Sequence, residues 1–270
     1  MAARWQRRAR SAKKRRCRVE FQVMTLDDPL PLAARRRNAT LACAPLALTL
    51  LLCAFACAAL LAARWLVGGR LAYRFLAWNL FLAGLPFAFA LLASLLHESA
   101  VPGRLRTVSV AALLVLWLLF FPNAPYMVSD LSHLHARAVG VPFWFDAVLF
   151  GAFLSTGVAA GLASLLLVHG MVVRRLGRLA GWTAIGLASL LAGFGIYLGR
   201  FERLNSWDVL TRPLQVLAVA FDPARSPLAH ARTLVVTLLY GGFVLLGYLA
   251  VVAMLHAGRQ LLPAPPPRER

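Results

Sequence analysis

Six apolar runs, each long enough to cross a membrane, constrain this chain more than any other feature. They cover about residues 41–63, 74–96, 106–121, 146–170, 179–198 and 233–256. A membrane-spanning helix needs about 20 apolar residues, and backbone groups in lipid must be hydrogen-bonded within the protein. We therefore predict an all-α fold, a polytopic transmembrane helix bundle of about six spans. The 60% hydrophobic content and the mean hydropathy of +0.71 exclude an ordinary soluble protein.

The Lys and Arg residues predict how the spans are oriented. A cytoplasmic N-terminus places 20 of the 29 basic residues on the cytoplasmic side, which agrees with the positive-inside rule. Without residues 1–23 the balance falls to 11 against 9, and the short loop 171–178, with three arginines, then supports the same orientation. We predict that the N-terminus and the C-terminus are both cytoplasmic.

The same pattern divides the chain into three regions. We predict a basic cytoplasmic arm over residues 1–40, a transmembrane helical domain over 41–257, and a Pro/Arg-rich cytoplasmic tail over 258–270. Residues 1–23 have two open interpretations: an arm that lies on anionic lipid headgroups, or an over-extended gene model whose start is Met24. The formal net charge of +19 is carried mostly beside apolar segments, so we expect the lipid bilayer as partner and no nucleic acid.

The two longest polar loops, about 122–145 and 199–232, emerge on the same outer face under this topology. Long loops in compact bundles are more often sites than connectors. The candidate residues of the first loop are Asn123, Tyr126, Asp130 and His133, and those of the second are Arg200, Arg203, Asn205, Trp207 and Asp208. We predict that a polar site forms where these two loops lie.

The conformation of the first loop decides what its ionisable residues can do. In a helical turn, Asp130 and His133 share a face, so the carboxylate can orient the imidazole or share a cation with it. In an extended segment, His133 and His135 share a face instead. A structural interpretation also stays open, in which Asn123 or Ser129 caps a short helix and the histidines lie in interfacial water.

Two interpretations of the second loop also stay open. Arg200 and Arg203 are spaced to clamp a phosphate or carboxylate. Alternatively, they extend to lipid headgroups while Trp207 anchors the loop in the interface. The apolar periodicity after Asp208 predicts a short helix along the membrane surface, with Pro213 in its first turn.

Four stretches resemble a known family. They are LFFPNAPYMVSDLSHL, GRFERLNSWDVL, WNLFLAGLPF and GVAAGLASL, and they are similar to the domain-of-unknown-function 1361 family (DUF1361) of bacterial membrane proteins over about residues 70 to 257. Ser129 stands where many relatives are expected to have Thr. The resemblance implies a multi-pass protein of the bacterial cytoplasmic membrane without an assigned activity.

Three hypotheses for function follow from the residues. A membrane-surface hydrolase or transferase would use His133 as general base or metal ligand, Asp130 and Asp208 as carboxylates, and an arginine as anion clamp. A small-solute or lipid transporter would use the loops as the mouth of a path. A structural or accessory membrane protein would use them to cap helices. The pattern leaves open whether the chain is an enzyme, and whether it binds a metal or a cofactor.

Glycines predict close helix packing. Gly157 and Gly161 form a GxxxG pair in the fourth run, and Gly193, Gly195 and Gly199 crowd the fifth. Such pairs let helix backbones approach closely. We predict that the fourth and fifth runs pack together, and the pattern leaves self-association between copies open.

Overall fold

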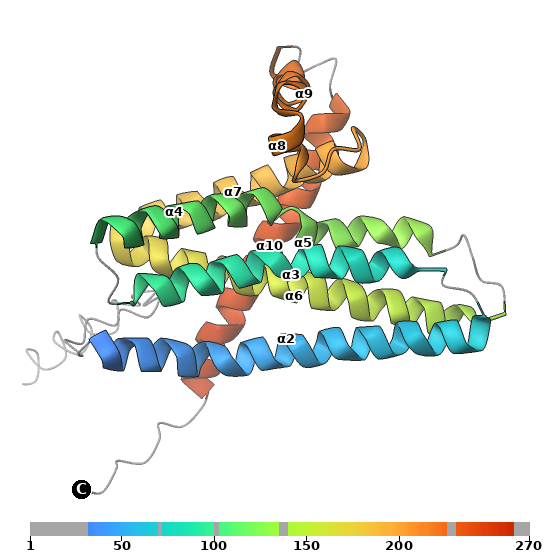
Figure 1. Ribbon diagram of the computed structural model, residues 1–270, viewed down its shortest axis with the longest axis horizontal. Coiled ribbons are helices and arrows are strands. Elements are labelled where there is room, and N and C mark those ends of the chain that lie inside the picture. The colour runs from blue at the N-terminus through green and yellow to red at the C-terminus, as the bar shows by residue number, and fades with distance from the viewer. Residues whose placement is uncertain (1–31, 70–71, 100–102, 135–139, 226–230, 262–270) are drawn as a thin grey trace, which may run out of the picture.

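The computed structural model describes residues 32–69, 72–99, 103–134, 140–225 and 231–261, and every element in those ranges is helical (Figure 1). Residues 1–31 of the predicted arm 1–40, His135, and residues 262–270 of the predicted tail 258–270 lie outside the described residues. The long helices are α2 (Leu32–Gly68), α3 (Arg74–His97), α4 (Gly103–Phe120), α6 (Phe143–Leu176), α7 (Arg178–Arg200) and α10 (Ala231–Leu261). The short elements are α5 (Asn123–Tyr126), the 3-10 helix η1 (Met127–His133), α8 (Asp208–Thr211) and α9 (Pro213–Arg225).

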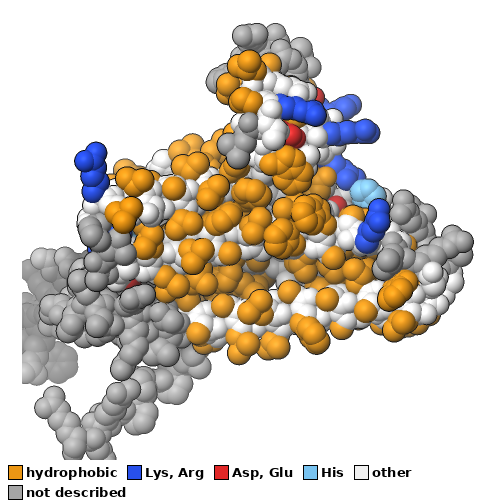
Figure 2. Space-filling model, in the orientation of Figure 1, with side chains coloured by type: hydrophobic (Ala, Val, Ile, Leu, Met, Phe, Trp, Pro, Cys, Tyr) orange, Lys and Arg blue, Asp and Glu red, His pale blue; other side chains and the backbone are white. Residues whose placement is uncertain are grey.

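Six helical segments in the described ranges are long and apolar enough to cross a membrane, as the sequence predicts. Their order places the ends of α2, α4 and α7 and the starts of α3, α6 and α10 toward one end of the bundle, which we call the loop end (Figure 1). The segments 121–134 and 201–208 both lie there. Figure 2 shows the Lys and Arg side chains of the visible face near the ends of the bundle, with hydrophobic side chains between them.

Helix α6 forms the centre of the bundle. Half of its most apolar stretch is buried inside the protein, compared with 6% for α2. Two hydrogen bonds fix its polar side chains: Trp117 donates to Ser164 at 3.0 Å, and His169 bonds to the Tyr248 hydroxyl at 2.6 Å. These partners matter because a polar group in lipid has no water to replace them.

Helices α6 and α7 pack together as predicted, but the glycines named in the prediction make their close contacts with other segments. A methyl group at Gly157 would lie 2.7 Å from Met127 Cγ, and one at Gly161 would lie 2.7 Å from Ala124 Cβ. Gly193 faces the backbone of α10, and Gly195 faces Pro122. The small residues of α6 therefore make room for the segment α5–η1, which periodicity within one helix could not indicate.

Candidate functional site

Two prolines build the local structure of the first candidate loop. Neither Pro122 nor Pro125 has a backbone N–H, so the regular hydrogen bonds of α4 cannot continue through them. The chain still turns helically, with the Tyr126 N–H donating to the Pro122 carbonyl at 3.0 Å. Helix α4 therefore ends at Phe120, close to the end of the predicted third run at residue 121, and the chain continues helically through α5 and η1 to His133.

The break leaves the last carbonyls of α4 in need of donors, as at any helix end. Asn123 donates its side-chain amide to the Phe120 carbonyl at 2.8 Å and to Ser206 Oγ at 3.1 Å. Ser206 in turn donates to the Leu119 carbonyl at 3.1 Å. The two candidate loops therefore meet at the end of α4, where Ser206 of the second loop donates a hydrogen bond that α4 itself cannot supply.

A second set of contacts joins the loops around η1. Asp130 is 2% exposed and accepts a hydrogen bond from the Asn79 amide of α3 at 2.8 Å. Arg200, at the end of α7, donates to Ser132 Oγ. Arg200 and His133 both contact Ser132, which lies two residues after Asp130 in η1. The structure thus brings Asp130, His133 and Arg200 into one neighbourhood.

His133 lies at the edge of this neighbourhood. Its Nδ1 is 3.3 Å from Ser132 Oγ, and its ring lies 5.2 Å from the Phe75 ring, measured between centroids. The Ser132 hydroxyl itself donates to the Ser129 carbonyl at 2.9 Å. The imidazole therefore contacts a hydroxyl that already has a backbone acceptor.

Asp208 is bound within its own loop. Its carboxylate accepts the Asn205 backbone N–H at 2.7 Å and the Thr211 hydroxyl at 3.2 Å. The backbone N–H holds the pKa of the Asp208 carboxyl below its usual range, so the group is ionised at neutral pH. Its hydrogen bonds shape the turn that begins α8.

The described residues of these segments do not form a set of three side chains that could bind a metal ion. In the parts of the chain that the structure describes, no group of three or more His, Cys, Asp or Glu side chains could hold a metal ion. Three or four protein ligands are usual for catalytic and structural zinc. The described groups suit hydrogen bonding and anion binding better than metal coordination.

A cavity of about 480 Å³ lies beside these contacts, between α3, α4 and α7. Its apolar wall includes Leu82, Leu119 and Leu198. Its polar groups are Asn79, Asn123, Tyr126, Asn205 and Ser206. The volume is within the range of small-molecule sites, and a few polar groups in an apolar cavity are typical of them.

The cavity opens toward the lipid-facing surface. Trp78 and Val115, which line it, are 54% and 67% exposed and belong to membrane-spanning segments. An exposed apolar side chain on a span faces acyl chains in a bilayer. A molecule dissolved in the membrane therefore has direct access to the cavity.

The candidate residues stand in different places relative to this cavity. Asn123, Tyr126 and Asn205 line it, and Arg200 directly follows the lining residue Gly199. Arg203 is exposed, with a left-handed backbone φ of 54°, and Trp207 is 38% exposed. The lining residues with an amide or hydroxyl side chain that were not among the predicted site residues are Asn79 and Ser206. A polar residue in the apolar stretch WNLFLAGLPF was the available signal for Asn79.

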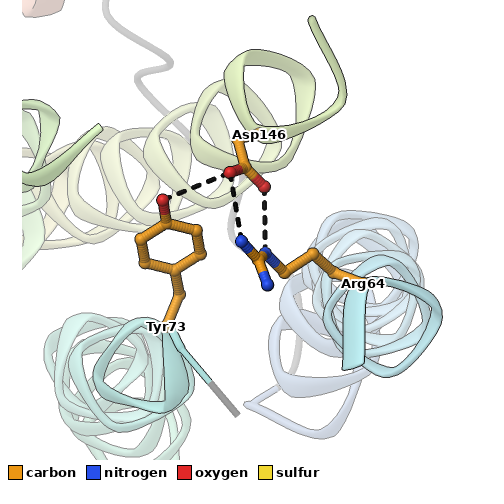
Figure 3. Close-up of polar contacts among 3 residues, drawn as sticks. All are labelled: Arg64, Tyr73 and Asp146. Atoms are coloured by element: carbon orange, nitrogen blue, oxygen red, sulfur yellow. Dashed lines mark hydrogen bonds and ion pairs between the residues drawn. The ribbon is translucent and has the colours of Figure 1, made fainter. Parts of the chain in front are cut away.

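The sequence also did not reveal a buried charged group away from the cavity (Figure 3). Arg64 and Asp146 are 2% and 0% exposed. The guanidinium donates to the two carboxylate oxygens at 3.1 and 3.3 Å, and the Tyr73 hydroxyl donates to one of them at 3.2 Å. This group joins the end of α2, the N-cap of α3 and the first turn of α6.

The model of a protein family matches most of the described helices. It is the family described as "Protein of unknown function (DUF1361)", and the match covers residues 78–259. The chain belongs to the DUF1361 family. No curated protein and no solved structure matches it.

The extent of the DUF1361 match is informative. Every residue that lines the cavity falls inside residues 78–259. Helix α2, with Arg64, precedes the matched region, as the resemblance implied. The Arg64–Asp146 pair therefore attaches a helix outside the family match to one inside it.

The buried pair gives a testable prediction for folding. Asp146→Asn should destabilise the protein by about 3–5 kcal/mol, because it leaves a buried guanidinium without its carboxylate. The double variant Arg64→Met/Asp146→Leu should recover much of that loss. Glu98→Gln is the matched control, because the Arg174–Glu98 pair is long (3.9 Å) and partly exposed, so its loss should cost less than about 1 kcal/mol. Equal effects of Asp146→Asn and Glu98→Gln in detergent unfolding experiments would contradict this account.

Proposed function

We propose that this DUF1361 protein binds a lipid-type amphiphile in the cavity between α3, α4 and α7. The apolar chain of the ligand lies against Leu82, Leu119 and Leu198, and its polar group lies at the end lined by Asn123 and Asn205. The observation that carries the proposal is the cavity itself, which combines an opening toward the lipid with hydrogen-bonding groups at one end.

The polar end supports this proposal because its side chains differ in how strongly they are hydrogen-bonded within the protein. Asn123 is committed to the Phe120 carbonyl and to Ser206. The Asn205 backbone N–H is committed to Asp208 at 2.7 Å, whereas its side-chain amide lies 3.5 Å from the same carboxylate, a weak contact. The Asn205 amide is therefore the group best able to exchange its contact for a ligand.

A role for Asp130 and His133 in chemistry on the bound molecule stays a prediction at the same site. Asn79 lines the cavity and also donates to Asp130, so a ligand at the polar end would lie one side chain away from that carboxylate. Transport of the ligand is the other alternative. Both require the binding step that we propose.

We infer that the loop end faces outward from the bacterial cytoplasmic membrane and that both termini are cytoplasmic. The support is the distribution of basic residues, above all Arg174, Arg175 and Arg178 in and beside the α6–α7 connection. Reporter fusions after Pro142 should read as external, and fusions after Arg178 as cytoplasmic. The reverse pattern would place the cavity in the cytoplasmic leaflet.

Filling the cavity tests the binding proposal. Val115→Trp places a large side chain at the lining of the cavity and should weaken binding of monooleoylglycerol, an uncharged amphiphile, at least about tenfold. Val108→Trp is the matched control, because Val108 lies on the same helix, is 60% exposed and does not line the cavity. Native mass spectrometry of the detergent-purified protein measures the bound lipid, and the melting temperature checks folding.

The outcomes separate clearly. Retained binding in Val108→Trp with loss in Val115→Trp supports the proposal. Equal binding by both variants and the wild type would place the lipid elsewhere on the surface and overturn it. If Val115→Trp does not fold, Leu119→Trp fills the cavity from its inner wall and replaces it in the same comparison.

A further inference from the structure

Two arginines beside the polar end of the cavity have no carboxylate partner in the described residues. Arg200 is partly buried, and it donates a hydrogen bond to the neutral Ser132 hydroxyl. Arg203 is exposed. The side-chain ion pairs described elsewhere in the protein are Arg64–Asp146 and Arg174–Glu98. Arg200 and Arg203 therefore differ from Arg64 and Arg174, which each pair with a carboxylate.

The nearby carboxylates are already bound by neutral donors. Glu202 accepts the Tyr197 hydroxyl at 2.8 Å. Asp208 accepts the Asn205 N–H, and Asp130 accepts the Asn79 amide. Acidic groups thus lie close to the arginines without pairing with them, which leaves guanidinium N–H groups available for an anion.

The hydrogen bond of Arg200 argues against the interpretation in which its side chain only extends to lipid headgroups. Its side chain reaches Ser132, a residue 68 positions away, and so bridges the two candidate loops. An arginine that only reaches for water or headgroups would have no need of such a contact. The contact instead holds the guanidinium against η1, while the backbone of Arg200 directly follows Gly199, which lines the cavity.

We propose that Arg200 binds the phosphate of a phospholipid-type headgroup whose acyl chain occupies the cavity, with Arg203 as a second cation at its exposed side. This inference rests on the proposed function and adds the class of the headgroup. The planar guanidinium has five N–H donors in a fork that fits two phosphate oxygens at once. One of its terminal nitrogens donates to Ser132, and the fork can bind phosphate with its remaining donors.

The experiment compares two lipids with the same oleoyl chain, oleoyl lysophosphatidylglycerol and monooleoylglycerol, on the wild-type protein in detergent. The phosphate-bearing lipid should bind at least about tenfold more tightly, as expected for a hydrogen bond to a charged group. Arg200→Gln should remove this preference, mainly by weakening the binding of the phosphate-bearing lipid. Arg203→Gln should reduce the preference less, since its side chain is exposed.

Arg104→Gln is the matched control, because Arg104 is an exposed arginine near the opposite end of the bundle. It should retain the full preference. Glycerol 3-phosphate, which has the phosphate but no acyl chain, should not displace oleoyl lysophosphatidylglycerol at the concentrations at which that lipid saturates the protein. Competition by this compound would identify a water-soluble anion as the ligand and overturn the headgroup assignment.

The remaining outcomes distinguish the two proposals. If the wild type binds both lipids equally, the headgroup inference is wrong and the cavity proposal stands. If it binds neither lipid, the cavity proposal fails and this inference fails with it. If Arg200→Gln does not fold, Arg200→Lys keeps the charge without the fork and should still lower the preference severalfold.

Discussion

The interruption of the third membrane-spanning segment by Pro122 and Pro125 is the constraint on which the rest of the candidate site depends. A proline removes a backbone donor, and in a membrane the unpaired carbonyl has no water to bind. The prolines end the regular helix, and the side chains of Asn123 and Ser206 then donate to the Phe120 and Leu119 carbonyls at its end. The break is therefore the reason that two loops far apart in the sequence meet.

The meeting of the loops also explains where the cavity lies. Helix α4 ends at Phe120, while α5 and η1 continue against α3 and against the glycines of α6. The segment after α7 returns to the end of α4 through Ser206. A space remains between α3, α4 and α7 that no described side chain fills. Its polar groups include Asn123 and Ser206, whose side chains hydrogen-bond to the last carbonyls of α4.

Hydropathy alone predicts the membrane-spanning part of the fold well, because each span must be apolar over a fixed length. The six predicted runs correspond to the six candidate spans. Helix α4 ends at Phe120, as the third run predicts, but the candidate span continues to His133, because a proline that stops one helix can also begin the next turn. The Arg64–Asp146 pair could not be predicted, because opposite charges 82 residues apart pair only when three helices are in place.

Residue type indicated some of the residues at the candidate site, and tertiary packing decides the others. Asn123, Tyr126 and Asn205 stand in polar motifs of the loops, so residue type alone indicated them, and they line the cavity. Asn79 lies in an apolar helix, and its partner Asp130 comes from another segment. Its place depends on how α3 packs against η1, which is tertiary information.

The measurement that tests the central claim most directly is cross-linking between the two loops in the native membrane. In a background with Cys17, Cys43, Cys53 and Cys57 replaced by alanine, Asn123→Cys and Ser206→Cys should join through a short thiol-specific cross-linker, because their side chains lie 3.1 Å apart in the present structure. The pair Asn123→Cys and Arg203→Cys, with the exposed Arg203 position, should join much less. Failure of the first pair to cross-link, or equal yield from both, would contradict a site in which Ser206 lies against the break in α4.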